Sequence, residues 1–255
     1  MYNDEIVHIA AEAGKIMLEN GGETYRVEQT ISMICNAYNI KSTESFVTPT
    51  VVMISITNQM GETTTVIRRI TSRTVDLEKI AAINNLSRSL YSKPLLMKDL
   101  KDEVKKIERH QRYGNKITII AAGVTTAFFS LLFGGNIRDF FISFIAGILI
   151  KLLSNYLDRL DVNGFFINVL GGALAALIAL MVSTFLPGFN VDKIIIGSIM
   201  LLVPGLAITN GIRDTIAGDL LSGLSRSLEA LMIAGAIAAG TGIVFKTWIY
   251  IFGGV

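Results

Sequence analysis

Hydrophobic residues follow two different patterns along this 255-residue chain, and the change falls near residue 116. In the first part apolar residues alternate with polar ones, whereas in the second part they form long runs. A helix needs about 20 mostly apolar residues to cross a bilayer. Runs of that kind occupy residues 117–135, 140–157, 165–186, 194–209 and 228–252. The pattern predicts a mainly α-helical membrane protein, with five transmembrane helices in a transport domain at residues 116–255.

The first part, residues 1–115, has the spacing of a mixed α and β domain. Apolar residues recur at helical spacing up to Met17, and Gly21-Gly22 ends that helix. β-Branched and aromatic residues, which favour strands, follow on both sides of Pro49. Beyond this first helix, we expect helices at 23–38, 76–91 and 95–111 and strands at 45–48, 51–57 and 63–70. These elements predict an α+β head domain that precedes the membrane part.

The distribution of charge supports this division and excludes several functions. Of the first 115 residues 29 are charged, but only 15 of the remaining 140. The net charge of +2 is too small to indicate a nucleic-acid partner. One cysteine and two histidines favour neither a disulfide framework nor a zinc site. Because the chain also lacks a glycine-rich phosphate loop and a GxSxG motif, we expect no enzyme, no metal and no cofactor.

Basic residues predict the orientation in the membrane. Seven Lys and Arg residues lie between positions 98 and 116, directly before the first apolar run. They place the head in the cytoplasm of a bacterial cell and the runs in its inner membrane. Five crossings then leave Val255 on the extracytoplasmic side.

The fourth apolar run is interrupted at Pro204-Gly205. Proline removes a backbone donor and glycine loosens a helix, so we expect a break there. A broken helix at membrane depth is tolerated where it lines a cavity, and the half-helix after the break would present its amides to an anion. A simple proline kink explains the same residues equally well.

A polar stripe follows the break. Thr215, Asp219, Ser222, Arg226 and Glu229 are spaced three or four residues apart, so they share one face if residues 214–229 form a single helix. Asn210 and Asp214 lie on an adjacent face. Arg226 could bind a substrate carboxylate or pair with Asp219, and Asp214 or Asp219 could carry a coupling proton. The alternative is a solvated surface helix, in which case the next candidates are Lys151, Asn155 and Asp158.

Two stretches resemble the threonine/serine exporter family. The first is Gly21-Gly22-Glu23-Thr24-Tyr25-Arg26-Val27-Glu28 in the head, together with Phe46-Val47-Thr48-Pro49-Thr50. The second contains Pro204-Gly205, Asn210, Arg213-Asp214, Gly218-Asp219, Ser222-Gly223 and Arg226. The chain resembles the larger, head-bearing subunit of the split type, such as the bacterial succinate exporter. The resemblance implies export of threonine or serine, or of a dicarboxylate, together with a second five-span membrane subunit.

We therefore expect a subunit of an inner-membrane exporter that works by proton-coupled alternating access. The expected substrate-binding residues are Pro204, Gly205, Asn210, Arg213, Ser222 and Arg226, and the expected proton-coupling residues are Asp214 and Asp219. The lipid bilayer, a small carboxylate-bearing metabolite, and a second subunit or further copies of this chain are the expected partners. A membrane-anchored ligand sensor or scaffold is the alternative from another class.

Overall fold

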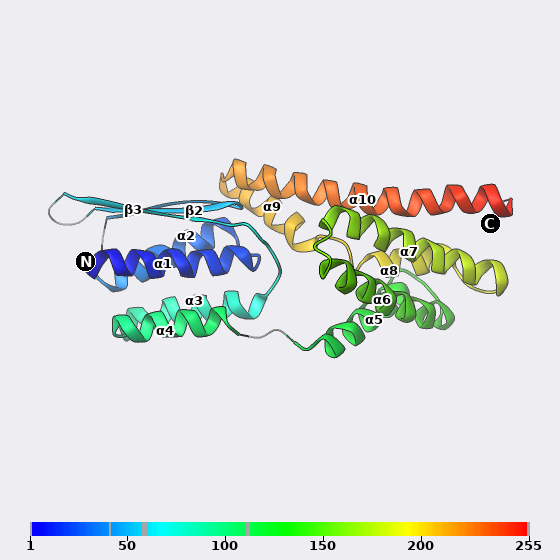
Figure 1. Ribbon diagram of the computed structural model, residues 1–255, viewed down its shortest axis with the longest axis horizontal. Coiled ribbons are helices and arrows are strands. Elements are labelled where there is room, and N and C mark those ends of the chain that lie inside the picture. Colours follow the sequence, from blue (N-terminus) through cyan, green and yellow to red (C-terminus); the bar gives the residue numbers. More distant parts are fainter. Residues whose placement is uncertain (1, 41, 58–60, 111–112, 254–255) are drawn as a thin grey trace. The chain divides into compact units, whose positions relative to one another are not determined.

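The structure is a computed structural model that describes residues 2–40, 42–57, 61–110 and 113–253. The chain forms two compact units, whose elements are labelled in Figure 1. The first unit joins Met1–Arg112 to Leu206–Ser227, and the second joins Tyr113–Gly205 to Leu228–Val255. The first unit thus draws on two stretches that lie far apart in the sequence. The predicted boundary between a head domain and a transport domain at residue 115 stays a prediction.

The N-terminal stretch of the first unit contains helices and strands in alternating groups. In chain order they are α1 (Tyr2–Glu19), α2 (Thr24–Ala37), β1 (Thr43–Thr48), β2 (Val51–Thr57), β3 (Thr63–Arg69), α3 (Leu77–Ser92) and α4 (Met97–Glu108). The strands form one antiparallel sheet in the order β1-β2-β3. Each predicted helix and strand of the head is present with ends shifted by only a few residues. Gln111, the expected end of the last head helix, lies outside the described residues.

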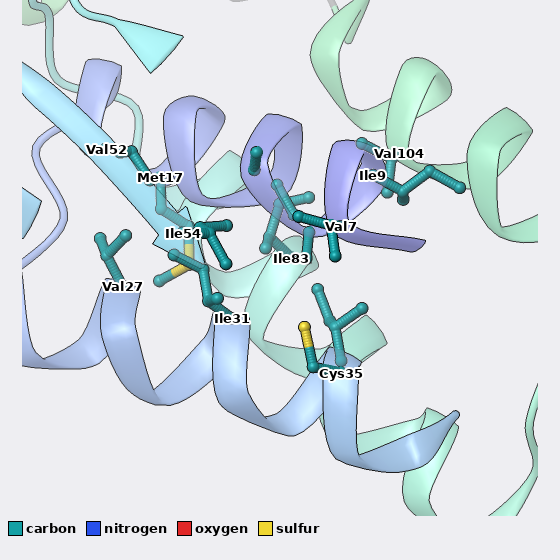
Figure 2. Packing of buried hydrophobic residues seen from close by; sticks show 14 of the residues in the cluster. Val7, Ile9, Met17, Val27, Ile31, Cys35, Val52, Ile54, Ile83 and Val104 are labelled. Atoms are coloured by element: carbon teal, nitrogen blue, oxygen red, sulfur yellow. The ribbon is translucent and has the colours of Figure 1, made fainter. Parts of the chain in front are cut away.

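The sheet and the four helices form layers, with α1 and α2 between the sheet on one side and α3 and α4 on the other (Figure 1). One face of the sheet is buried because alternate residues of β2, Val52, Ile54 and Ile56, point toward the helices. Figure 2 shows how Ile54 meets Met17 of α1 and Ile31 of α2. Large aliphatic side chains therefore fill the core of this unit.

The second unit is built from apolar helices, four of them long and one short. They are α5 (Asn115–Leu132), α6 (Ile137–Asp158), α7 (Gly164–Phe185), α8 (Val191–Ile199) and the greater part of α10 (Leu220–Phe252). Within the described residues, α5, α6, α7 and α10 are long and apolar enough to cross a membrane. These four helices are consistent with the predicted membrane protein and match four of the five predicted spans. The fourth predicted span is divided between the short α8 and the following α9 (Gly205–Ala217).

Small residues bring these helices into close contact. A Cβ atom on Gly147 of α6 would lie 2.8 Å from the carbonyl oxygen of Ala122 on α5, and one on Gly172 of α7 would lie 2.7 Å from that of Ile237 on α10. Backbones approach this closely only where a side chain is missing. Larger side chains, including Phe166 and Leu231, point outward and are exposed.

The single carboxylate buried at the start of α6 has a structural explanation. Asp139 accepts a hydrogen bond from the backbone N–H of Asn136 and forms a capping box with it. The same carboxylate accepts bonds from the backbone and side chain of Asn190, at 2.9 and 2.8 Å. Asp139 therefore caps one helix and ties it to the segment that leads into α8.

Candidate functional site

The predicted helix break is present. Helix α8 ends at Ile199, α9 begins at Gly205, and Pro204 is the last residue between them. Proline cannot donate a backbone hydrogen bond and disfavours helical geometry at the residue before it, here Val203. The residue types at this position therefore account for the break.

A second break was not predicted. Gly218 adopts a left-handed conformation (φ +95°) that ends α9, and α10 starts two residues later. Asp219 N donates to Asp214 O at 2.9 Å and Gly218 N donates to Thr215 O at 3.2 Å, which are the two bonds of a Schellman motif. The condition that residues 214–229 form a single helix is therefore not met. The polar stripe is divided between two helices that form a hairpin.

Glycines allow the two arms of this hairpin to touch. A Cβ atom on Gly223 of α10 would lie 2.9 Å from the carbonyl oxygen of Gly211 on α9. The close approach places Asp214 of α9 beside Arg226 of α10, twelve positions later in the sequence.

The loop between α1 and α2 lies against this hairpin. Helix α1 also ends in a Schellman motif, because Gly21 is left-handed (φ +96°) and Gly22 N donates to Met17 O at 2.8 Å. The turn leaves the carbonyl groups of both glycines available as acceptors. Asn210 Nδ2 donates to Gly21 O at 2.9 Å, and Arg226 Nη2 donates to Gly22 O at 2.7 Å.

An ion pair forms the centre of the site. Arg226 Nε lies 3.0 Å from Asp214 Oδ2, and the two side chains are only 7% and 0% exposed. Thr24, the first residue of α2, donates its hydroxyl to the same Asp214 oxygen at 3.1 Å. The other oxygen, Oδ1, is buried and forms no hydrogen bond with any residue that the structure describes. A buried carboxylate oxygen without a partner is costly, so a hydrogen-bond donor is favoured at this position.

Further charged groups surround the pair. Arg213, which is about half exposed, pairs with Glu23 of the head loop. Glu28 of α2 accepts a hydrogen bond from Val47 N at 3.1 Å. Burial raises the pKa of Glu28, the bond from Val47 lowers it, and the negative charge of Asp219 raises it further.

The structure brings together four of the predicted site residues as buried side chains: Asn210, Asp214, Ser222 and Arg226. Arg213 lies at the edge of this group, and Asp219 lies in the turn between α9 and α10. The remaining two, Pro204 and Gly205, belong to the second unit. Sequence reasoning assigned the head loop no role in the site. The signal was present, because the loop and the hairpin both lie within the stretches that carry the family resemblance.

Comparison with known proteins identifies a class of membrane transporters. Residues 8–248 match the ThrE family, described as "Putative threonine/serine exporter", and the chain belongs to this family. It is 23% identical over 247 residues to the "Threonine/serine exporter" of Corynebacterium glutamicum, covering 93% of this chain and 50% of that protein. It is also 23% identical over 253 residues to the "Probable succinate transporter subunit YjjP" of Klebsiella aerogenes, covering 95% of this chain and 94% of that protein.

The chain thus spans about half the length of the exporters that it matches and nearly all of the succinate transporter subunit. A second exporter, from Mycobacterium tuberculosis, is 20% identical over 242 residues, covering 94% of this chain and 46% of that protein. No solved structure matches the chain. The family and these relatives are named as transporters, which confirms the prediction of a transport protein rather than an enzyme.

Proposed function

We propose that the chain is a subunit of an inner-membrane exporter for small carboxylate-bearing metabolites, either threonine and serine or a dicarboxylate such as succinate. The observation that carries the proposal is the buried Arg226–Asp214 pair at the head loop, in a chain of an exporter family. Arginine binds a carboxylate through two parallel hydrogen bonds. Arg226 therefore has the chemistry to exchange the carboxylate of Asp214 for that of a substrate.

Proton coupling follows if Arg226 exchanges the Asp214 carboxylate for that of the substrate. A proton on Asp214 removes the charge that holds Arg226, so proton binding and substrate binding favour each other. Asp219, which affects the pKa of Glu28, is the second candidate for the coupling proton. Because the head loop donates and accepts hydrogen bonds at the same pair, its movement would open and close the site during alternating access. Pro204 and Gly205 would supply the flexible break next to α9, and Asn210, Arg213 and Ser222 would complete the site.

The membrane arrangement is part of the proposal. The broken α8–α9 segment would form a fifth crossing beside α5, α6, α7 and α10, with the head in the cytoplasm and the C-terminus outside. Relatives named as a transporter subunit support a second subunit as partner. Reporter fusions at Val255 would test the topology, because cytoplasm-only reporters stay inactive there if the number of crossings is five.

Efflux of threonine and of succinate from loaded cells tests the function, with this chain expressed alone and with a second five-span subunit. Arg226→Lys keeps the charge but loses the two-point contact. We expect it to weaken transport about ten- to a hundredfold, the equivalent of about 1.5–3 kcal/mol for one charge-assisted contact. Asp214→Asn and Asp219→Asn identify the coupling group, since only the coupling variant should lose the pH dependence of transport.

A charge swap separates a binding role from a structural one. The double variant Asp214→Arg with Arg226→Asp keeps a buried ion pair but moves the guanidinium to the other helix. If the pair only holds the hairpin to the head loop, the swap should restore both abundance and export. Normal abundance without export supports the proposal, whereas normal export in the swap contradicts it. The sensor alternative is favoured if neither metabolite is exported by the wild type with its partner, while the head still binds one of them.

A further inference from the structure

Helix α6, a candidate membrane helix, carries a lysine in its second half. Lys151 lies seven residues before the end of α6 at Asp158. In the part of the chain that the structure describes, Lys151 has no ion-pair or hydrogen-bond partner. An ionisable side chain inside a membrane helix is costly and usually faces a polar cavity or a ligand.

A cavity of about 300 Å³ lies at this lysine. It is lined by Thr118, Ala121, Ala122 and Thr125 of α5, Lys151 of α6, and Leu201. The four α5 residues are spaced three, one and three positions apart, so they share one face of that helix. The alanines make room, and the lysine and threonines supply polar groups. The volume is at the small end of about 300–1,000 Å³, the usual range of ligand pockets, and the cavity opens to the surface of the unit, where Ala121 and Thr125 are exposed.

The position of Leu201 connects the cavity to the helix break. This residue lies between the end of α8 at Ile199 and the start of α9 at Gly205. Irregular backbone at membrane depth is tolerated where it lines a cavity rather than lipid. The cavity therefore lies where the break requires a polar environment, and all its lining residues belong to the second unit.

Unpaired hydroxyl groups continue along the same helices. Ser130 of α5, Ser143 of α6 and Ser198 of α8 are fully buried, and their hydroxyls have no hydrogen-bond partner among the described residues. These three serines lie on α5, α6 and α8 but do not line the cavity. Helices α5 and α6 are in contact beyond the cavity lining, because Thr126 Oγ1 donates to the carbonyl oxygen of Ser143 at 2.7 Å. Buried hydroxyls without partners are expensive unless water or a polar solute reaches them.

We propose that the α5–α6 cavity is a carboxylate-binding site of the transport pathway, with the Lys151 ammonium as counter-ion. The inference rests on the proposed function and adds to it a second anion site, built from residues of the second unit alone. One fixed cation compensates one carboxylate. The hydroxyls of Thr118 and Thr125 donate to Asn115 O and Ala121 O of their own helix, so their oxygens remain as acceptors for a hydroxyl or ammonium group of the solute.

Binding and efflux of threonine and succinate test the site in the full chain, reconstituted in nanodiscs for binding and expressed with its partner subunit for efflux. Lys151→Gln should weaken binding of the transported metabolite at least tenfold, and Lys151→Arg should retain most of it. Lys246→Gln is the matched control, because Lys246 is an exposed lysine on the candidate membrane helix α10 and does not line the cavity. The Lys246→Gln variant should bind the transported metabolite as tightly as the wild type does.

A labelling experiment covers the case in which Lys151→Gln is poorly made. In a Cys35→Ser background, Thr125→Cys places a thiol in the cavity while the lysine is kept. The transported metabolite should slow labelling of this thiol by a water-soluble reagent, and adding Lys151→Gln should remove the protection. Absence of protection overturns the proposal.

The outcomes distinguish the two proposals. Efflux by the wild type together with normal binding and efflux by Lys151→Gln overturns the cavity site and leaves the exporter function intact. A wild type that neither binds nor exports either metabolite overturns both. Loss of binding in Lys151→Gln with an unaffected Lys246→Gln supports the cavity site.

Discussion

The head core and the membrane unit differ in which side chains they bury. In the head, the buried side chains are large and aliphatic, including Ile16, Ile31, Ile54 and Leu90, each less than 2% exposed. In the membrane unit, the helices meet through glycine and alanine, and large side chains such as Leu231 point outward. Water drives large apolar groups inward, whereas lipid is as apolar as leucine and offers no such force. The same residue types therefore mark the inside of one unit and the outside of the other.

The largest expected effect comes from deleting methyl groups in the two regions. Ile31→Ala in the head should reduce the free energy of unfolding by about 2–5 kcal/mol, because it leaves a cavity in a filled core. Ile120→Ala on α5 makes the same deletion at a side chain that is 57% exposed, and should cost less than about 1 kcal/mol. Urea unfolding of the full chain in detergent measures both. Equal losses would contradict the difference between the two regions.

Adding a methyl group, rather than deleting one, should destabilise the membrane unit where its helices are in close contact. A Cβ atom on Gly240 of α10 would overlap the backbone of Val169 on α7, whereas one on Gly235 of the same helix meets nothing within 4 Å. Gly240→Ala should cost about 1–3 kcal/mol through overpacking. Gly235→Ala should be neutral or slightly stabilising, since alanine favours helices. Thermal unfolding in detergent compares the two, and a neutral Gly240→Ala would show that these helices do not depend on close contact.

A smaller effect concerns the charge at the edge of the head. The pKa of Glu28 is raised above its ordinary value of 4.5, so the folded chain holds this proton more tightly than the unfolded chain. Its contribution to stability is present below pH 4.5 and is lost as the pH rises through the raised value. Glu28→Gln should remove this loss. As the pH rises from 4.5 through the raised pKa, the variant should therefore become more stable relative to the wild type. Asp219→Asn should remove part of the same loss of stability, because the negative charge of Asp219 helps to raise the pKa of Glu28.

Unfolding at several pH values, with Glu19→Gln as a second half-buried carboxylate for comparison, checks this prediction. Burial also raises the pKa of Glu19, but Asp219 does not contribute there. An Asp219→Asn effect that is the same in the wild type and in the Glu28→Gln variant would contradict the coupling of these two carboxylates.

The smallest effect is on reactivity rather than stability. Burial raises the pKa of the Cys35 thiol to about 11, and the side chain is 0% exposed. At pH 8 the reactive thiolate is then about a thousandth of the population. Alkylation of the folded chain should be at least a hundredfold slower than in urea, which mass spectrometry can follow. Rapid labelling of the folded chain would mean that the head core opens readily.

Most of the helices and strands follow from local residue spacing. Thr24–Ala37 and Val51–Thr57 differ by no more than a residue at either end from what was expected, because Gly21-Gly22 and Pro49 limit them on one side. The hairpin at Gly218 was missed because the polar spacing of residues 215–229 also fits one continuous helix. A glycine followed by an aspartate is compatible with both, and tertiary contacts at Gly211 and Gly223 decide between them.

The partners of the site residues could not be predicted in the same way. Arg226 and Asp214 were both singled out, but the partners considered for Arg226 were Asp219 and a substrate carboxylate, and its partner in the structure is Asp214. The contacts with Gly22 and Thr24 span about 200 positions and leave no local pattern in one sequence. The lysine in α6 was noticed, whereas its cavity depends on the packing of three separate segments.

The division of the first unit between two distant stretches has a consequence for synthesis. Residues 1–110 leave the ribosome with their own aliphatic core and can pack at once, but the carbonyl groups of Gly21 and Gly22 must wait for Asn210 and Arg226. Roughly 90 residues, those of the first membrane helices, are made in between. At about 5–20 residues per second, that interval is about 5–20 s. The carbonyl groups of the loop therefore lack these two donors while α5, α6, α7 and α8 are made, and gain them only once α9 and α10 follow.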